Sequence, residues 1–147
     1  MDKIKLISII DEILTPLGFH KQRTNSWIRK GKEVSTKVHL QKSLYGNLYY
    51  FRVYYVLNKL HLIKSDVKNE CFADVDFSDD KLLYKMCDLE SDVSDDERER
   101  VLRRIVDNDM SNHRYIETEK ELKEMIITKK IPVFIVIKDY LGIAYSK

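Results

Sequence analysis

Apolar and polar side chains alternate in two neighbouring stretches of the chain, residues 34–41 and residues 49–57. A period of two is typical of a strand that has one buried and one exposed face. Tyr45, Gly46 and Asn47 lie between the two stretches, and Gly and Asn tolerate the positive φ that a tight turn needs. The pattern predicts a long antiparallel hairpin at the centre of the fold.

A helical period precedes the hairpin. Apolar residues recur there at spacings of three and four, at Ile4, Ile7, Ile10, Leu14 and Leu17. This spacing predicts an amphipathic helix over residues 2–15, with Asp2 as its cap. Pro16 and Gly18 favour its end, and we expect Phe19 to fold back into the core.

Shorter patterns predict the other strands of the sheet. Residues 26–29, SWIR, favour a first strand before the hairpin, and residues 58–69 favour a polar connection after it. The next strand is predicted by four apolar residues that alternate with polar neighbours, Cys71, Ala73, Val75 and Phe77. Residues 81–91 are apolar in part but short, and we interpret them as a loop or a marginal strand.

Three helices are predicted in the second half. Ser94 to Glu97 and Thr118 to Glu121 each form a capping box, a sequence typical of a helix start. Residues 132–142 combine strand propensity with helical spacing, and Pro132 and Gly142 suit a helix start and exit, so we predict a helix there. The fold class is therefore α+β, one domain over residues 1–147. It comprises an N-terminal helix, an antiparallel sheet of three to five strands around the central hairpin, and three C-terminal helices that cover one sheet face.

Composition narrows the function classes. The two cysteines show no CxxC spacing, which favours reduced thiols, and the longest apolar run, residues 133–137, is too short to span a bilayer. No segment after Met1 resembles a signal peptide, so we expect a cytoplasmic protein with no membrane partner. Residues 1–64 carry twelve Lys and Arg and four Asp and Glu, a net charge of +8, whereas residues 65–147 carry fourteen and twenty, a net charge of −6. This division is compatible with a basic face for a polyanion or with ordinary solvated surfaces.

Motifs for catalysis are missing from the sequence. It contains no GxSxG, no HExxH and no glycine-rich phosphate loop. Asp107, Asp109 and His113 are close in sequence but are better explained as a solvated helix end than as metal ligands. Asp79 and Asp80 are better explained by a turn than by paired acid and base. We therefore expect no catalytic residues, no metal and no cofactor.

The polar side of the hairpin is the candidate binding surface. Tyr50, Arg52 and Tyr54 share one strand face, and Lys37, His39, Gln41 and Ser43 share a face of the other strand. If both sets lie on the same side of the sheet, aromatic rings, a guanidinium and hydrogen-bonding groups gather on a surface that suits a peptide or a single-stranded nucleic acid. The alternative is that the tyrosines only shield an open sheet face.

Several short motifs together resemble a bacterial family. They are Leu17-Gly18-Phe19, Trp27-Ile28-Arg29, Leu40-Gln41-Lys42-Ser43 with Tyr45-Gly46-Asn47, and Tyr140-Leu141-Gly142-Ile143. Together they resemble the bacterial domain-of-unknown-function family numbered 4304 over almost the whole chain. That family has no assigned activity, so the resemblance implies a single small domain, supplies no catalytic residues, and directs attention to the hairpin motif.

The sequence thus predicts a non-catalytic interaction module that is a monomer or a weak homodimer. Seven residues form its candidate binding surface: His39, Gln41, Lys42, Ser43, Tyr45, Tyr50 and Arg52. We favour a protein or peptide partner over a nucleic acid, because the chain as a whole is not basic. Binding of single-stranded nucleic acid remains one alternative. A hydrolase or nuclease that uses Arg52, His39 and an acid such as Asp74 remains another.

Overall fold

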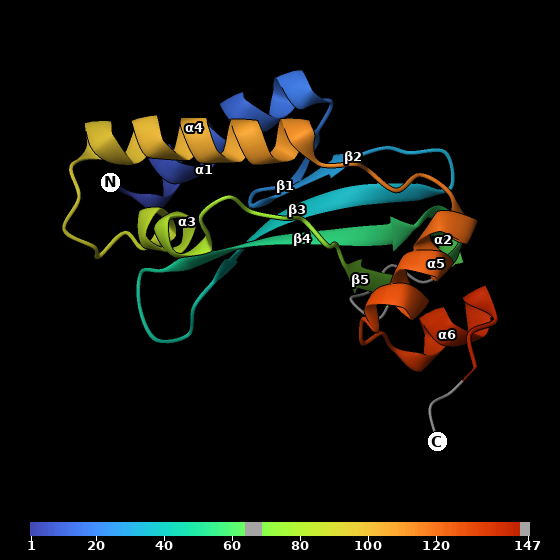
Figure 1. Ribbon diagram of the computed structural model, residues 1–147. Coiled ribbons are helices and arrows are strands. Elements are labelled where there is room, and N and C mark those ends of the chain that lie inside the picture. Colours follow the sequence, from blue (N-terminus) through green and yellow to red (C-terminus); the bar gives the residue numbers. More distant parts are fainter. Residues whose placement is uncertain (64–68, 145–147) are drawn as a thin grey trace. The chain divides into compact units, whose positions relative to one another are not determined.

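The five strands of the antiparallel sheet follow one another in chain order (Figure 1). They are β1 (His20–Arg23), β2 (Ser26–Arg29), β3 (Val34–Lys42), β4 (Tyr49–Leu57) and β5 (Glu70–Phe72). The helical segments are α1 (Lys3–Leu14), η1 (Thr15–Leu17), α2 (Asn58–Ile63), α3 (Asp80–Cys87), α4 (Asp95–Asn112), α5 (Glu119–Lys129) and α6 (Ile135–Leu141). This computed structural model describes residues 1–63 and 69–144. The α+β class, the N-terminal helix and the central hairpin are confirmed.

The chain forms two compact units. Unit 1 consists of Met1–Ile28, Val38–Arg52 and Asp74–Arg114, and unit 2 consists of Arg29–Lys37, Val53–Ala73 and Tyr115–Lys147. The chain passes between the units five times, and three of these passages fall inside β2, β3 and β4. The expectation of a single domain stays a prediction.

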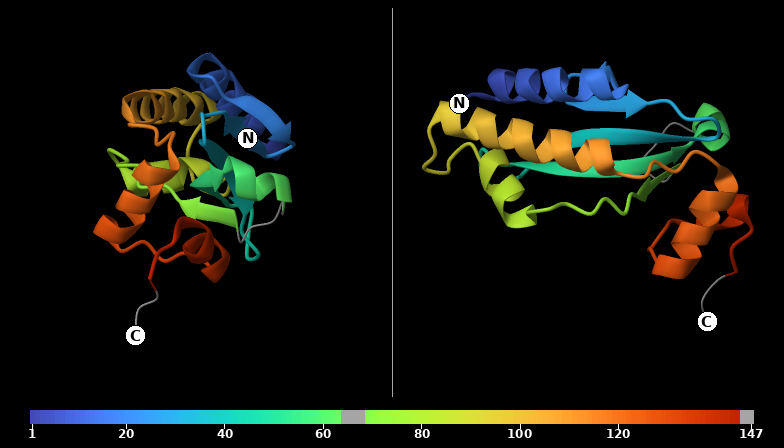
Figure 2. Two further views of the ribbon diagram at one scale, coloured as in Figure 1. Left: turned by 90° about the vertical axis from the view of Figure 1, so that its right-hand side faces the viewer. Right: turned by 45° about the horizontal axis from the view of Figure 1, so that its top comes forward.

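Unit 1 packs two helices against its strands. The two views of Figure 2 and Figure 1 agree that α1 and α4 lie side by side, and the apolar face of each helix is buried. The indole Nε1 of the buried Trp27 in β2 donates a hydrogen bond of 2.8 Å to Oδ1 of Asp11 in α1. This bond gives the one polar atom of a large core ring a partner and joins α1 to β2. Ile4, predicted in the buried stripe of α1, is instead 79% exposed.

Helix starts follow the capping signals. The side chains of Asp2, Ser94 and Thr118 accept hydrogen bonds from backbone N–H groups three residues later, and each thereby uses a donor that the first helical turn leaves unpaired. The helix predicted near residue 132 is confirmed, but α6 begins at Ile135 rather than at Pro132. Gly142 ends α6 with a φ of 69°, a conformation that favours glycine.

Unit 2 buries its own apolar cluster. Its members include Tyr55 of β4, Cys71 of β5, Leu122 of α5 and Ile137 of α6. At its surface the Tyr140 hydroxyl donates a 2.7 Å hydrogen bond to Glu119 Oε2, and this bond raises the pKa of Tyr140 to about 12. The bond ties α6 to the first turn of α5.

Three further local predictions are wrong, and one strand was not predicted. Residues 58–63 form the short helix α2 rather than the start of the predicted polar connection, and residues 64–68 of that connection lie outside the described residues. β5 ends at Phe72, so the predicted alternation through Phe77 does not continue as a strand. β1 was not predicted, because its four residues, HKQR, are all polar and exposed. Residues 81–91 were predicted as a loop or a marginal strand, but residues 81–87 belong to helix α3.

The hairpin turn differs from the prediction in its geometry. Among residues 1–63 and 69–144, positive φ occurs at Gly18, Lys130 and Gly142, and therefore not at Gly46. A Cβ added at Gly46 would lie 2.7 Å from Oε2 of Glu90. Glycine at this position gives room to a neighbouring carboxylate side chain rather than permitting a special backbone conformation.

No helix in the described part of the chain combines the length and the apolar character needed to cross a membrane.

Candidate functional site

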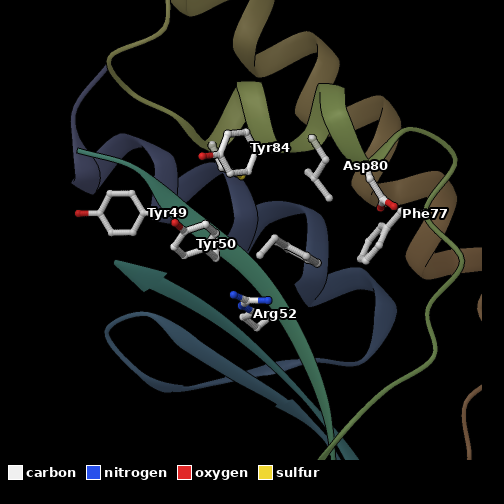
Figure 3. Close-up of a pocket in the computed structure, with 9 residues that line it drawn as sticks. Tyr49, Tyr50, Arg52, Phe77, Asp80 and Tyr84 are labelled. Atoms are coloured by element: carbon white, nitrogen blue, oxygen red, sulfur yellow. The ribbon is translucent and has the colours of Figure 1, made fainter. Parts of the chain in front are cut away.

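A pocket of about 170 Å³ opens in unit 1 beside the first half of β4 (Figure 3). Residues 49–52 of β4 form one wall, and α3 forms the opposite wall with Asp80, Leu83, Tyr84 and Cys87. Phe77, in the connection before α3, closes one end. The pocket therefore lies between a strand and a helix that are almost thirty residues apart in sequence.

Helix α3 forms because acidic residues precede a short apolar face. The Asp79 carboxylate accepts a 3.0 Å hydrogen bond from the Leu82 N–H, which caps the helix start. Leu83, Met86 and Cys87 are buried at helical spacing. Tyr84 lies on the outer side of this face and is 51% exposed. The helix thus presents one aromatic ring to the pocket while its other apolar residues pack inward.

Arg98 of α4 holds the C-terminal end of α3. Its side chain is buried, with 1% exposed, and its Nη1 donates to the carbonyls of Met86 at 2.7 Å and Asp88 at 2.8 Å. Its Nη2 donates to the carbonyl of Ser91 at 3.2 Å. The last carbonyls of a helix carry partial negative charge and lack partners within the helix, so a guanidinium is a suitable group to bind them.

Asp109 of α4 holds the other end of the pocket. Its Oδ2 accepts hydrogen bonds from the N–H of Ser78 at 3.1 Å and from the Ser78 hydroxyl at 3.2 Å. The adjacent Phe77 ring contacts the Phe51 ring edge-on, with centroids 5.8 Å apart. The prediction that Asp109 belongs to a solvated helix end is wrong, because this carboxylate is buried and accepts both hydrogen bonds from Ser78.

Arg52 is the cation of the pocket. Its guanidinium carbon lies 5.0 Å from the centre of the Tyr50 ring, a distance at which a cation and a ring attract each other. Its Nε is buried and donates to no hydrogen-bond acceptor in residues 1–63 and 69–144. In the same part of the chain, no carboxylate forms an ion pair with it. A half-buried guanidinium therefore faces the pocket with hydrogen-bonding capacity to spare.

Tyr50 contacts both this cation and a second tyrosine ring. The ring centroids of Tyr50 and Tyr84 are 6.0 Å apart, with an angle of 46° between the ring planes. In Figure 3 the Tyr50 ring lies between the Tyr84 ring and Arg52. Such a set combines apolar contact area, a charge and hydroxyl groups in a small volume.

Cys87 lines the base of the pocket as a neutral thiol. Burial raises its pKa from an ordinary 9.0 to about 12, although the positive charge of Arg98 acts in the opposite direction. A thiolate is the nucleophilic form of cysteine, so this side chain is not an activated nucleophile at neutral pH.

The predicted surface residues separate into three groups. Tyr50 and Arg52 line the pocket, as part of its β4 wall. Residues 42–45 instead build the hairpin turn: Lys42 Nζ donates to the carbonyls of Ser43 and Gly46, both at 3.3 Å, and the Ser43 hydroxyl accepts from the N–H of Tyr45 at 3.1 Å. Tyr45 is 96% exposed at the tip. The hairpin motif therefore has a visible structural role.

Gln41 and His39 lie on β3 and are not among the residues that line the pocket. Gln41 is exposed, and His39 Nε2 lies 3.4 Å from Asn25 Nδ2. The Ser43 N–H donates a 2.8 Å hydrogen bond to the Leu48 carbonyl, a pairing that places Gln41 opposite Tyr50 and His39 opposite Arg52 on the two antiparallel strands. The two predicted sets thus lie on one side of the sheet.

The proposed catalytic set is not assembled in the pocket. Arg52 lines it, but neither His39 nor Asp74 does, and the acid in its lining is Asp80. Sequence analysis missed Phe77, Asp80 and Tyr84 as site residues. One sequence signal could have predicted helix α3 and so pointed to this segment: Asp79 suits a helix cap, and apolar residues follow it at spacings of three and four.

Comparison of the chain with protein-family models, curated proteins and solved structures finds no match in any of the three. The resemblance to the bacterial family numbered 4304 therefore stays a prediction.

Proposed function

We propose that this protein is a non-catalytic module that binds a peptide or protein segment in the pocket of unit 1, with Tyr50, Arg52 and Tyr84 as its contact residues. The observation that carries the proposal is the half-buried Arg52 guanidinium, which stacks on Tyr50 and has no hydrogen-bond acceptor in residues 1–63 and 69–144. The buried Nε is not accessible to a ligand, but the terminal nitrogens also form no hydrogen bond or ion pair with the described chain, and a guanidinium held against a ring at the edge of a pocket can bind a group from outside through them.

Pocket size favours one anchoring group over a whole small-molecule ligand. Its volume of about 170 Å³ is below the roughly 300–1,000 Å³ typical of small-molecule sites. Tyrosine and arginine are enriched among the residues that dominate protein interfaces. A single side chain of a partner, packed against the Tyr50 and Tyr84 rings, matches both properties.

A peptide also fits better than a nucleic acid strand. Single-stranded nucleic acid binds along a basic groove where successive bases stack on exposed rings. Here one pair of tyrosine rings is in contact, and one of them stacks on a single cation. With one basic and one acidic residue in its lining, the pocket offers no run of cations that could follow a phosphate backbone.

Selection from a library of random peptides displayed on phage tests the proposal. We expect peptides to be enriched on the intact protein and to lose binding when Tyr50→Ala and Tyr84→Ala are combined, because both pocket rings are then absent. The control is Tyr45→Ala, which removes the same ring from the exposed hairpin tip and should leave binding unchanged. Circular dichroism confirms that each variant is folded.

Two results would contradict the proposal. One is no peptide enrichment on the intact protein, and the other is equal binding by the intact protein and the double variant. A fluorescent oligothymidylate at low salt supplies the competing test: binding that the double variant loses would identify a nucleic-acid module instead.

A further inference from the structure

We infer that the group which enters the pocket is a carboxylate on a short aliphatic stem, bound by Arg52, so that the partner segment carries an acidic residue or ends there. This inference rests on the proposed peptide-binding function and adds the chemical class of the partner's anchor.

The first step is the geometry of the cation. A guanidinium offers donors in a planar fork that matches the two oxygens of a carboxylate. Stacking on Tyr50 restricts the plane of the Arg52 guanidinium, and its buried Nε lacks an acceptor in the described chain. A cation that is already oriented loses less side-chain freedom when it binds, which increases affinity.

The second step is the charge balance of the pocket. Arg52 is the basic residue and Asp80 the acidic residue among those that line it, and Asp79 caps the adjacent helix start. A dianionic phosphate would meet one positive charge and two nearby carboxylates. A monoanionic carboxylate halves both the attraction to Arg52 and the repulsion from the two acids. Because the acids outnumber the cation, the smaller charge is opposed less, so a carboxylate fits this balance better than a phosphate.

The third step is the apolar wall. The rings of Tyr50 and Tyr84 and the side chain of Leu83 line the same pocket as Arg52. A methylene stem gains contact with these groups while its carboxylate reaches the guanidinium, so the stem and the head group of a glutamate or aspartate are both accommodated. A chain-terminal carboxylate offers the same head group from a different source.

NMR titration of the isotope-labelled protein with capped amino acids tests the inference. The probes are N-acetylglutamate amide, with a side-chain carboxylate; N-acetylglutamine, with a terminal carboxylate; N-acetylglutamine amide, which is neutral; and N-acetylphosphoserine amide. We expect one of the two carboxylates to shift the Arg52 Nε–Hε and Tyr84 ring signals with a dissociation constant at least about tenfold below that of the neutral amide. The carboxylate probe that binds more tightly shows whether the partner's carboxylate belongs to an acidic side chain or to a chain terminus.

Two substitutions make the test specific. Arg52→Gln should remove the preference for carboxylate over amide, and Arg52→Lys should keep only part of it, because lysine has the charge without the planar fork. Arg100→Gln removes an equal charge from the exposed face of α4 and should leave the preference intact.

Three results would overturn the inference: equal affinity for charged and neutral probes, tighter binding of the phosphorylated probe, or equal losses in Arg52→Gln and Arg100→Gln. A protein that selects library peptides but shows no carboxylate preference would keep the proposed function and lose this inference. Failure of the peptide selection itself would remove the proposed function.

Discussion

Two arginines of unit 1 occupy contrasting environments. Arg98 is fully buried and donates through Nη1 and Nη2 to carbonyls at the end of α3, whereas Arg52 stacks on Tyr50 and donates to no acceptor in the described chain. The Nε atoms of both lack acceptors there, so the contrast lies in the terminal nitrogens. Burial alone therefore does not identify a functional charge. Unused donors beside an opening distinguish the candidate binding arginine from the structural one.

Replacing the structural arginine should have the largest effect. We expect Arg98→Met to lower the free energy of unfolding by about 3 kcal/mol, because several buried carbonyls at the end of α3 lose their donor. Urea denaturation measures this change. Arg100→Met on the same helix is the control and should stay within about 0.5 kcal/mol of the parent. A similar small value for Arg98→Met would show that these hydrogen bonds do not stabilise the fold.

Asp109→Ala should destabilise the protein by about 2 kcal/mol, because the N–H and hydroxyl of Ser78 both lose their acceptor. The exposed Asp107→Ala on the same helix provides the matched comparison in urea denaturation. The Phe77 ring signals in NMR should also shift in Asp109→Ala. If they do not, Asp109 has no part in positioning the pocket wall around Arg52.

The buried thiol beside Arg98 predicts a pH dependence. Because the pKa of Cys87 is about 12 in the folded protein and near 9.0 when the chain is unfolded, the unfolded state loses the proton first. The contribution of Cys87 is therefore full below pH 9 and declines by at most about 1.4 kcal/mol per pH unit as the pH rises from about 9 towards 12. Unfolding free energies between pH 8 and 10.5 should fall less steeply in Cys87→Ala. Identical slopes in the two proteins would contradict a buried, neutral thiol.

Arg52→Met should have the smallest effect on stability, within about 0.5 kcal/mol, because no hydrogen bond to the described chain is lost. Urea denaturation of Arg52→Met and Arg98→Met under the same conditions compares their free energies of unfolding directly. A loss of 2 kcal/mol or more would assign Arg52 to the framework and remove the basis for treating the two arginines differently.

Local signals predicted most of the fold. Capping residues and apolar spacing lie within a few positions of the helix they specify, so α1, α4 and α5 followed from Asp2, Ser94 and Thr118. Helix α3 was missed because Asp79 and Asp80 were interpreted as a turn, and because eight residues hold too few apolar positions for a clear period.

The candidate site was predicted only in part for a different reason. Alternation along β4 identified Tyr50 and Arg52, but Tyr84 and Phe77 reach the same pocket from a distant segment, and no local pattern states which segments meet. The burial of Asp109 depends on Ser78, thirty-one positions away, so its environment was equally hidden from sequence analysis.

The five passages of the chain between the units limit how this protein can be divided or rearranged. A cut after residue 28 divides unit 1 and a cut after residue 114 divides unit 2, while each of the other three cuts divides both units; three of the five cuts would sever a strand. Neither unit can be expressed, fused or exchanged as one uninterrupted stretch of gene. Any recombination event that transfers the Arg52 pocket in working form must therefore carry residues of both units with it.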